Sequence, residues 1–310
     1  MKKIFVIISS LILLFFSNIN ASEVKILYKL ENEIITSHDI KNELNYLISL
    51  NNNLTSLGND KLNQIAVNSA IKEKIKYLEL INYFKLDEDN FEVDEIVLKE
   101  LFTRLNIKDL DSLKRYFTSY NLNLDQVKFK IKVELFWNKL IFDKYQKNIS
   151  INKNELKNKL INDLKNKDLI EEYFLREILF KLEENEILDE KYENIKETIE
   201  NTGFENAANI FSISNTAKFG GKIGWVSKIQ LSKKITNELD KIEKNNFTNY
   251  IPVGNGYLIV KVEDKRQIKS EFDLEKETKI LIQKETDRQL NQYSTNYFNK
   301  LKKNIFIYEL

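Results

Sequence analysis

The side chains that most often carry out covalent catalysis are scarce in this chain of 310 residues. Cysteine is absent, which excludes disulfides, thiolate metal ligands and cysteine nucleophiles. The single histidine, His38, follows a good N-cap residue, Ser37, so we expect it to be exposed in the first turn of a helix. One histidine also excludes most zinc sites and makes Ser-His catalysis depend on that residue. We therefore predict neither a metal site nor a cofactor.

Glycines gather in one segment whose sequence, Phe-Gly-Gly-Lys-Ile-Gly-Trp-Val, occupies residues 219–226. Glycine-rich loops can bind phosphate, but no Lys-Ser/Thr pair follows these glycines and no strand-to-helix context surrounds them. We therefore expect the glycines to form a tight turn and Trp225 to pack in a core.

The balance of charge argues against a nucleic-acid partner. Lysine and arginine total 48, and aspartate and glutamate total 47, which gives a formal net charge of +1. A general nucleic-acid binder would present a strongly basic surface. With 42% hydrophobic residues, the chain can form one large domain or two ordinary ones.

The first 21 residues have the pattern of a secretory signal peptide. Lys2 and Lys3 are followed by an almost unbroken apolar run over residues 4–16 and a short polar segment that ends at Ala21. A membrane-spanning helix needs about 20 apolar residues, so this run is short for a mature span. We predict cleavage after Ala21 and export. The alternative is an uncleaved membrane anchor.

Helical periodicity dominates residues 22–168. A short strand pair is expected at residues 23–35, and beyond it apolar side chains recur at steps of three and four residues. Such spacing places them on one buried face of each helix. The expected helices span residues 38–48, 62–84, 94–105, 110–120, 124–145 and 151–164.

The pattern changes near Glu171. Residues 173–182 and 256–263 alternate like strands, with helices between them at residues 189–201, 204–210 and 232–243. Residues 272–310 return to a helical pattern that is apolar enough to need a partner. The predicted fold class is α+β: a mostly helical N-terminal module is completed by a C-terminal helix, and an α+β domain is inserted between them.

Three sequence blocks in this inserted domain resemble the parvulin class of prolyl isomerases. In that family a Gly-Gly-x-hydrophobic-Gly-Trp loop precedes a helix and then a Gly-Tyr-His-hydrophobic strand that ends in Glu-Asp-x-Arg. Here the loop is residues 219–226, and the strand is Gly-Tyr-Leu-Ile-Val-Lys-Val-Glu-Asp-Lys at residues 256–265. Leu-Arg-Glu-Ile-Leu-Phe at residues 175–180 stands where the family has its opening His-Ile-Leu strand.

After the signal peptide, the segment Lys-Leu-Glu-Asn-Glu-Ile-Ile-Thr-Ser-His-Asp-Ile at residues 29–40 resembles the opening strand turn and helix of SurA-type periplasmic chaperones. A helical block, one parvulin-like domain and a final long helix complete that architecture. The resemblance implies a periplasmic location, with unfolded or nascent outer-membrane proteins as partners and the outer-membrane assembly machinery as a further candidate partner. It also implies a division into a signal peptide at residues 1–21, a helical N-terminal domain at 22–168, a parvulin-like domain at 171–266 and a C-terminal helix at 267–310 that packs on the N-terminal domain.

The polar active-site positions depart from the parvulin pattern. The family places two facing histidines, a Cys or Asp, and a Ser or Thr around the prolyl bond of the substrate. Aligned on the motifs, the two histidine positions are Glu177 and Leu258, the Cys/Asp position is Ser214, and the Ser/Thr position is Asn255. A carboxylate is the expected state of Glu177, solvated or paired on an edge strand.

The apolar proline pocket is better preserved. Its family positions fall on Leu231 and Ile235, and with Trp225 these are the candidate substrate-binding residues. Isomerisation must overcome an amide barrier of about 18–20 kcal/mol. Catalysis therefore depends on hydrogen-bond donors held in a dry site, and each such donor is worth about 10²–10³ in rate. Substitution of both histidines predicts weak or absent isomerase activity.

Two classes of function follow from the resemblance. The first is a binding protein: a periplasmic holdase for unfolded outer-membrane proteins, whose parvulin-like domain is weak or inactive. The second is an enzyme: an active peptidyl-prolyl cis-trans isomerase that acts on exported proteins. The substituted positions favour the holdase. A dedicated assembly partner of one membrane protein is a third option that the sequence does not separate from a general holdase.

Overall fold

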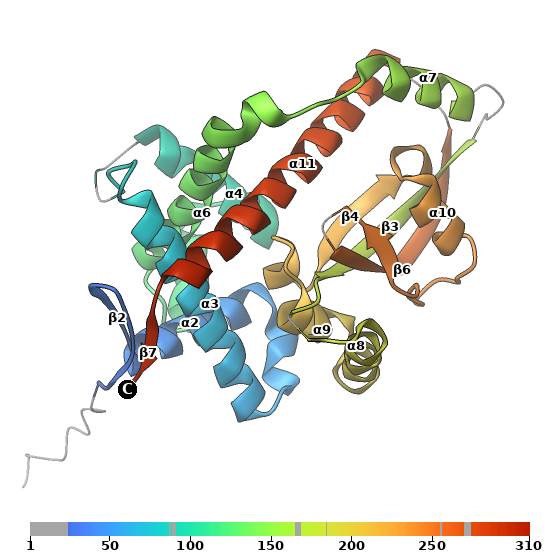
Figure 1. Ribbon diagram of the computed structural model, residues 1–310. Coiled ribbons are helices and arrows are strands. Elements are labelled where there is room, and N and C mark those ends of the chain that lie inside the picture. The colour runs from blue at the N-terminus through green and yellow to red at the C-terminus, as the bar shows by residue number, and fades with distance from the viewer. Residues whose placement is uncertain are drawn as a thin grey trace, which may run out of the picture.

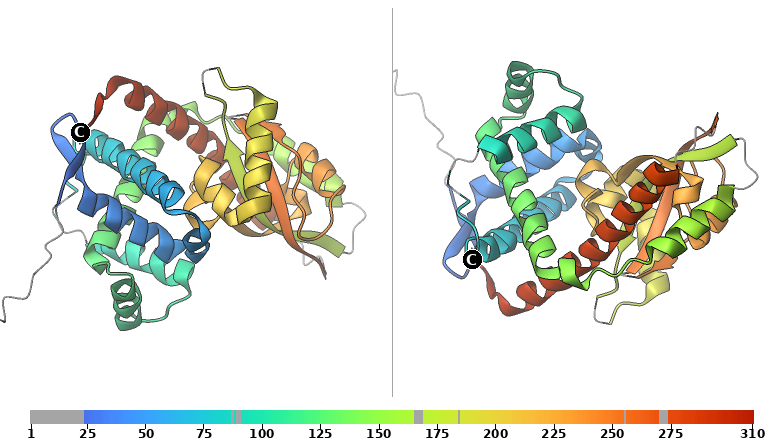
Figure 2. Two further views of the ribbon diagram at one scale, coloured as in Figure 1. Left: turned by 90° about the horizontal axis from the view of Figure 1, so that it is seen from below. Right: turned by 90° about the horizontal axis from the view of Figure 1, so that it is seen from above.

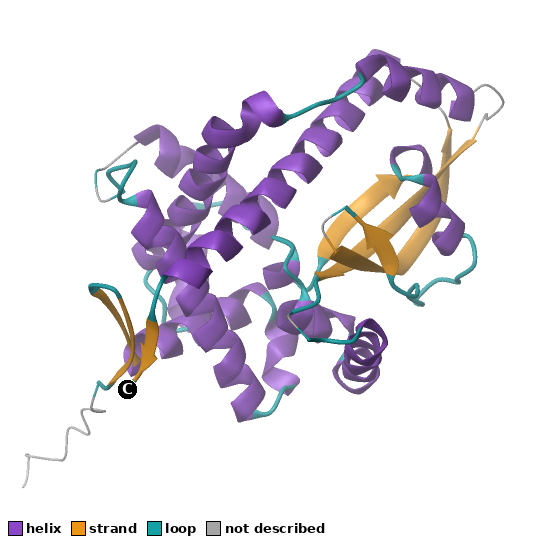
Figure 3. Ribbon diagram, viewed as in Figure 1, coloured by secondary structure: helices purple, strands orange, loops and turns teal. Residues whose placement is uncertain are grey.

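The computed structural model describes residues 24–86, 88, 91–164, 169–183, 185–254, 256–269 and 274–310. The predicted signal peptide lies outside these residues, and so does Asn255. The fold is α+β: a bundle of helices and a domain built on a four-stranded sheet lie side by side, and one long helix runs along both (Figure 1). Figure 3 shows how the strands are confined to the sheet domain and to a small sheet near the chain ends.

The helical module, which we define as residues 24–145, contains two strands and most of the helices of the N-terminal half. One apolar cluster lies between α4, α5 and α6 and buries Val97 and Phe117. A second lies between α3 and α6 and buries Trp137, and a third lies between the two strands, α2 and α3. The elements are β1 (Ile26–Leu30), β2 (Glu33–Thr36), α2 (Ser37–Leu50), α3 (Asn59–Leu80), α4 (Phe91–Leu105), α5 (Leu110–Ser119) and α6 (Leu124–Tyr145).

The first long helix, α2, begins one residue earlier than the sequence predicted. Thr36, not Ser37, is the N-cap: its side chain accepts a hydrogen bond from the backbone N–H of Asp39, and the Asp39 carboxylate accepts one from the backbone N–H of Thr36. This reciprocal pair satisfies two N–H groups at the helix end. His38 is exposed in the first turn, as predicted.

The sheet domain consists of a four-stranded antiparallel sheet in the order β4-β3-β6-β5, with helices on both faces. Helices α8 and α9 cover one face around Ile178 and Ile259, whereas α10 and the segment before it cover the other around Leu175 and Val260. The elements are β3 (Leu169–Phe180), α8 (Leu188–Thr202), α9 (Phe204–Phe211), β4 (Lys222–Ser227), α10 (Lys233–Leu239), β5 (Ile251–Val253) and β6 (Gly256–Lys269).

Helix α11 (Leu274–Asn304) connects the two parts of the molecule. Near its start it packs with α7 (Lys153–Leu164) beside the sheet domain, and farther along it packs on α6 (Figures 1 and 2). The rings of Tyr145 and Tyr293 stack at 4.6 Å, and the indole N–H of Trp137 donates to the Ser294 hydroxyl at 2.8 Å. Aromatic contacts of this kind add stability beyond area burial.

The chain ends in a strand that the helical pattern of the C-terminus did not predict. Strand β7 (Ile307–Glu309) pairs antiparallel with β1, so the sheet order is β2-β1-β7. The C-terminal segment is thereby fixed to the first strand of the helical module (Figure 1). A strand of three residues is too short to show a period, and it forms here because β1 offers a free edge.

Candidate functional site

Glu177, which takes the place of the first histidine, lies on an interior strand. We expected an edge strand from the sequence, but β3 is bordered by β4 and β6, so this expectation was wrong. The glycine segment approaches this position closely: the backbone N–H of Glu177 donates to the Gly221 carbonyl at 2.8 Å. At Gly221, φ is +74° and a Cβ atom would lie 2.2 Å from the Glu177 carbonyl oxygen. Only glycine fits there.

The Glu177 carboxylate is bonded by two hydroxyls from the loop after α9. Ser214 Oγ donates to Glu177 Oε1 at 2.6 Å, and Thr216 Oγ1 donates to the same oxygen at 2.9 Å. The structure thus brings two predicted site residues, Glu177 and Ser214, together. A hydroxyl has one proton to donate: that of Ser214 goes to the carboxylate, and that of Thr216 has the carboxylate and Ser214 Oγ, 3.1 Å away, as its acceptors. The cluster therefore offers acceptors, whereas a twisted prolyl amide needs donors.

Leu258, which takes the place of the second histidine, is buried beside the two predicted pocket residues. Its exposed fraction is 9%, and it belongs to the apolar cluster that also includes Leu231 and Ile235. Leu179 and Val260 are among the other aliphatic side chains of this cluster. They fill the space between the sheet and α10, so they form a packed core in this part of the molecule.

The remaining predicted site residue in the described chain, Trp225, lies apart from this group. The expected core position was wrong: 36% of Trp225 is exposed. Val226 is buried with the Leu258 cluster, and adjacent residues of a strand point to opposite faces, so Trp225 projects from the other face of the sheet. There its ring contacts Phe174, and the Arg266 guanidinium lies 4.0 Å from the ring centre.

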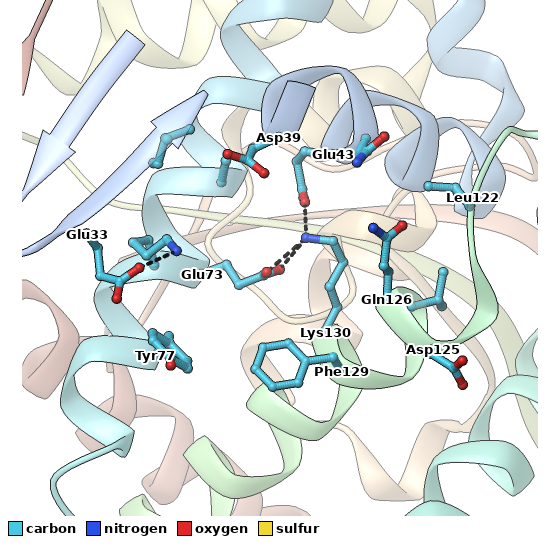
Figure 4. Close-up of a pocket in the computed structure, with 15 residues that line it drawn as sticks. Glu33, Asp39, Glu43, Glu73, Tyr77, Leu122, Asp125, Gln126, Phe129 and Lys130 are labelled. Atoms are coloured by element: carbon cyan, nitrogen blue, oxygen red, sulfur yellow. Dashed lines mark hydrogen bonds and ion pairs between the residues drawn. The ribbon is translucent and has the colours of Figure 1, made fainter. Parts of the chain in front are cut away.

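A cavity of about 530 Å³ lies in the helical module (Figure 4). Helices α2, α3 and α6 form its walls, and β2 lies at one end. Apolar side chains on several of these elements line part of the wall, including the neighbouring rings of Tyr77 and Phe129, whose centres are 6.0 Å apart. The apolar lining residues are Ile35, Ala70, Tyr77, Leu122, Val127 and Phe129.

A buried ion cluster lines the same cavity. Lys130 Nζ lies 2.6 Å from a carboxylate oxygen of Glu43 and 2.8 Å from one of Glu73 (Figure 4). The Ser69 hydroxyl also donates to Glu43, at 2.5 Å. Glu43 is 1% exposed. Burial opposes the charge on Lys130, but the two carboxylates outweigh it and raise the lysine pKa. One ammonium therefore pairs with two carboxylates, so the cluster contains one more acidic than basic side chain.

The electrostatics of the two carboxylates differ. Burial raises the pKa of Glu73, and the nearby charge of Glu43 adds to this effect. For Glu43, burial is outweighed by Lys130 and by hydrogen bonds, so its pKa is lowered. Glu33, Asp39 and Asp125 are also on the lining, and Glu33 pairs with Lys74 at 2.9 Å. The cavity thus combines an apolar wall with five acidic and two basic side chains. Such a surface suits an extended polypeptide that carries apolar side chains and amide or basic groups.

Neither the ion cluster nor the bond from Thr216 to Glu177 was predicted from the sequence. Glu43 lies between Ile40 and Leu47 at helical spacing, so a carboxylate on the buried face of α2 was a signal that could have been recognised. The partners of Glu43 come from two other helices, and their meeting depends on the tertiary fold.

The residues that the structure describes contain neither a metal-binding cluster nor a membrane-spanning helix. No group of three or more His, Asp or Glu side chains there is arranged to hold a metal ion. No helix in the same part of the chain is long and apolar enough to cross a membrane.

Comparison with known proteins identifies the sheet domain as similar to rotamases, and we call it the rotamase domain below. Residues 177–264 match the family model for rotamases, described as the PPIC-type PPIASE domain. The chain is also similar to the chaperone SurA of Pseudomonas putida (strain KT2440), with 26% identity over 168 residues. That match covers 52% of this chain and 39% of SurA, so it spans about two fifths of the relative. The chain thus resembles a SurA-type chaperone with a parvulin (rotamase) domain.

Two solved structures are similar to this chain over most of their length, with low overall superposition scores. A Campylobacter jejuni structure, from a study of the SurA-like chaperones PEB4 and Cj1289, has 18% identity, a TM-score of 0.35, and coverage of 92% of this chain and 99% of that one. PrsA of Bacillus subtilis has 17% identity, a TM-score of 0.30, and coverage of 90% and 91%.

Proposed function

We propose that this protein is an exported holdase: a chaperone that binds unfolded polypeptides in its helical module, with a rotamase domain of little or no isomerase activity. The observation that carries the proposal is the contrast between the two candidate sites. Glu177 and Ser214 bond to each other and Leu258 packs in an apolar cluster, whereas rings and carboxylates line an open volume of about 530 Å³ in the helical module.

The physical argument against efficient isomerisation rests on hydrogen-bond donors. Losing one preorganised donor costs about 10²–10³ in rate. Glu177 contributes acceptor oxygens, and Leu258 contributes no polar side-chain atom at all. We therefore expect a rate far below that of a parvulin with both histidines.

The argument for polypeptide binding rests on the lining of the cavity. Apolar and aromatic side chains such as Tyr77 and Phe129 make contacts that do not depend on one client sequence. Holding an unfolded chain there needs no covalent chemistry and lowers the concentration of species that aggregate.

We place the clients and the location by resemblance to SurA. The clients are unfolded outer-membrane proteins in the periplasm, reached after cleavage of a signal peptide at residues 1–21, with the outer-membrane assembly machinery as a further partner. The functional units are the helical domain at 22–168, the parvulin-like domain at 171–266, and residues 267–310, which complete the helical domain. The match of residues 177–264 to the rotamase family supports the alternative, an active prolyl isomerase on exported proteins.

The experiment uses residues 22–310 and a urea-unfolded outer-membrane β-barrel protein, diluted together while light scattering is followed. We expect aggregation to be suppressed at near-stoichiometric ratios without ATP. Ala70→Phe, which places a ring in the cavity, should weaken suppression at least about fivefold, a loss of roughly 1 kcal/mol of binding. Gln64→Phe adds the same ring at an exposed position of α3 and is the matched control.

Three results would overturn the proposal or a part of it. Absence of suppression by the unsubstituted protein would remove the holdase function. An isomerase rate equal to that of a histidine-bearing parvulin, measured on a proline-containing peptide, would favour the enzyme instead. Equal suppression by Ala70→Phe and Gln64→Phe would move client binding to another surface.

A further inference from the structure

A second large cavity lies where the helical module, the rotamase domain and α11 meet. We call it the junction cavity; its volume is about 490 Å³. Its lining comes from α2, α3 and α6, from β3 and the segment of residues 209–218, and from α11. Six lysines contribute to the lining: Lys72, Lys76, Lys181, Lys191, Lys218 and Lys302.

Positive charge exceeds negative charge around the junction cavity. The lining contains two acidic residues, Glu134 and Glu183, against the six lysines. Glu134 is shared by two of them: its carboxylate lies 2.6 Å from Lys76 Nζ and 3.4 Å from Lys218 Nζ. Burial opposes the charge on Glu134, but Lys76 and Lys218 outweigh it and lower the carboxyl pKa. The carboxylate stays ionised. Lys191 is also paired, with Glu186 at 2.7 Å, but an excess of lysine charge remains in the lining.

Lys72 supplies part of this excess. It lies one helical turn before Lys76 on α3 and is only partly exposed. Its ammonium forms no ion pair with any residue that the structure describes. Burial and the charge of Lys76 lower its pKa to about 8, with Glu134 opposing and Lys218 adding to the shift. A partly buried cation without a counter-ion costs stability, and an anion in the cavity would remove that cost.

The polar side chains of the junction cavity complement the lysines. Asn68 and Asn215 line it from the helical module and the rotamase domain, and Asn291 and Asn299 line it from α11. Carboxamide groups both donate and accept hydrogen bonds, as a peptide backbone does. The cavity is too large for one small anion to contact all of its lysines. It combines charge pairing by the lysines with hydrogen bonding by the asparagines.

We propose that the junction cavity binds the carboxylates of an acidic segment of an extended polypeptide. The proposal rests on the chaperone function proposed above, because the ligand is a stretch of a client chain. The lysines pair with side-chain carboxylates, and the asparagines bond to the peptide backbone. The acidic cavity of the helical module and the basic junction cavity would then accept different segments of one client.

The test uses two synthetic twelve-residue peptides, each with a zwitterionic rhodamine label. One carries four glutamates separated by serine and glycine, and the other carries glutamine at those four positions. Binding to residues 22–310 is followed by fluorescence anisotropy at low salt. We expect the glutamate peptide to bind at least about tenfold more tightly than the glutamine peptide, because several charge-assisted bonds are lost together.

Lys72→Gln should weaken binding of the glutamate peptide about fivefold to tenfold, since one charge-assisted bond is lost. Lys181→Gln is a second variant, and the Lys181 ammonium contacts Asn296 at 3.5 Å. Lys61→Gln, at an exposed position of the same helix as Lys72, is the matched control and should leave binding unchanged. Circular dichroism of each variant checks the fold.

Three outcomes would overturn the proposal: equal binding of the two peptides, equal losses from Lys72→Gln and Lys61→Gln, or binding of sodium succinate or phosphate without binding of the glutamate peptide. The last would assign a small-anion site. If the unsubstituted protein suppresses aggregation but does not bind the glutamate peptide, only this inference fails. If aggregation is not suppressed, the chaperone proposal fails, whatever the peptide does.

Discussion

In the rotamase domain, the hydroxyls of Ser214 and Thr216 bond to Glu177, and Leu258 packs against its apolar neighbours. In the helical module, Lys130 and its carboxylate partners border an open volume, together with the rings of the wall. The same kinds of side chain are present in both regions. Internal partners stabilise the fold in both regions, but a paired group that also borders a cavity, as Lys130 and Glu73 do, can in addition meet a ligand. A family match therefore locates a fold, and the function has to be argued from the site.

The largest expected effect comes from Lys130→Met, which removes the cation of the buried cluster. Two carboxylates would then share a site with no counter-charge, so the free energy of unfolding should fall by about 3–5 kcal/mol at pH 7. Chemical denaturation measures it. Lys139→Met, in an exposed pair with Asp143, is the control and should cost about 1 kcal/mol or less.

The pH dependence of Lys130→Met tests the same cluster. Without the ammonium, burial and mutual repulsion raise the pKa of Glu43 and Glu73 above the unfolded value of about 4.3. The folded state then binds more protons than the unfolded state, so stability should rise as pH falls from 7 to 5. A loss below 1 kcal/mol at pH 7, or a decrease in stability at pH 5, would show that the cluster is not the buried charge described here.

Gly221→Ala should destabilise the rotamase domain without altering the cavity of the helical module. The left-handed φ and a Cβ only 2.2 Å from a backbone oxygen predict that the free energy of unfolding falls by about 2–4 kcal/mol. Thermal unfolding measures this loss. Gly58→Ala is the control because no atom lies within 4 Å of its added Cβ. At temperatures where the variant remains folded, Gly221→Ala should suppress aggregation as well as the unsubstituted protein. A parallel loss of suppression would place client binding in the rotamase domain.

Lys72→Met sharpens the comparison in the opposite direction, because it should stabilise the protein. The pKa of Lys72 is about 8 in the folded chain against 10.5 for the free side chain, so the folded state binds this proton less well. The gain at pH 7 is at most about 3 kcal/mol and should decline as pH rises from 8 towards 10.5. Lys61→Met is the control for thermal unfolding. A destabilised Lys72→Met would mean that the ammonium has a partner in the fold.

Thr216→Val should give the smallest effect. It removes one hydroxyl from Glu177, at a cost of about 1 kcal/mol in the free energy of unfolding. Thr216→Ser keeps the hydroxyl and should recover most of that loss. Neither variant should change the suppression of aggregation, since Thr216 lines neither of the two cavities. A large loss of suppression in Thr216→Val alone would contradict this separation.

Much of the fold was predictable because it is local. The apolar spacing of α6 predicted residues 124–145, and these are the bounds of the helix. The glycine segment and the alternating strand located the rotamase domain, which the family match confirms. The short strand β7 was missed because its pairing with β1 joins the two ends of the chain, and no local pattern records such a partner.

The candidate sites were less predictable. Alignment placed Glu177 and Ser214 correctly as neighbours, but it could not show that Thr216 also bonds to the carboxylate. Trp225 was misplaced because its aromatic character suggested a core, while strand alternation puts it on the opposite face from Val226. Both cavities are formed by residues far apart in sequence, so their lining follows from packing alone.

The central claim is that clients bind in the cavity of the helical module and not in the rotamase site. Site-specific photocrosslinking tests it most directly. Benzoylphenylalanine replaces Phe129 in the cavity of the helical module, Ile235 in the apolar cluster around Leu258, or Gln64 on the exposed face of α3. Each variant is mixed with the urea-unfolded barrel protein on dilution and then irradiated. Crosslinks to the client from position 129 well above those from 235 and 64 are the predicted result. Crosslinks from position 235 with none from 129 would contradict it.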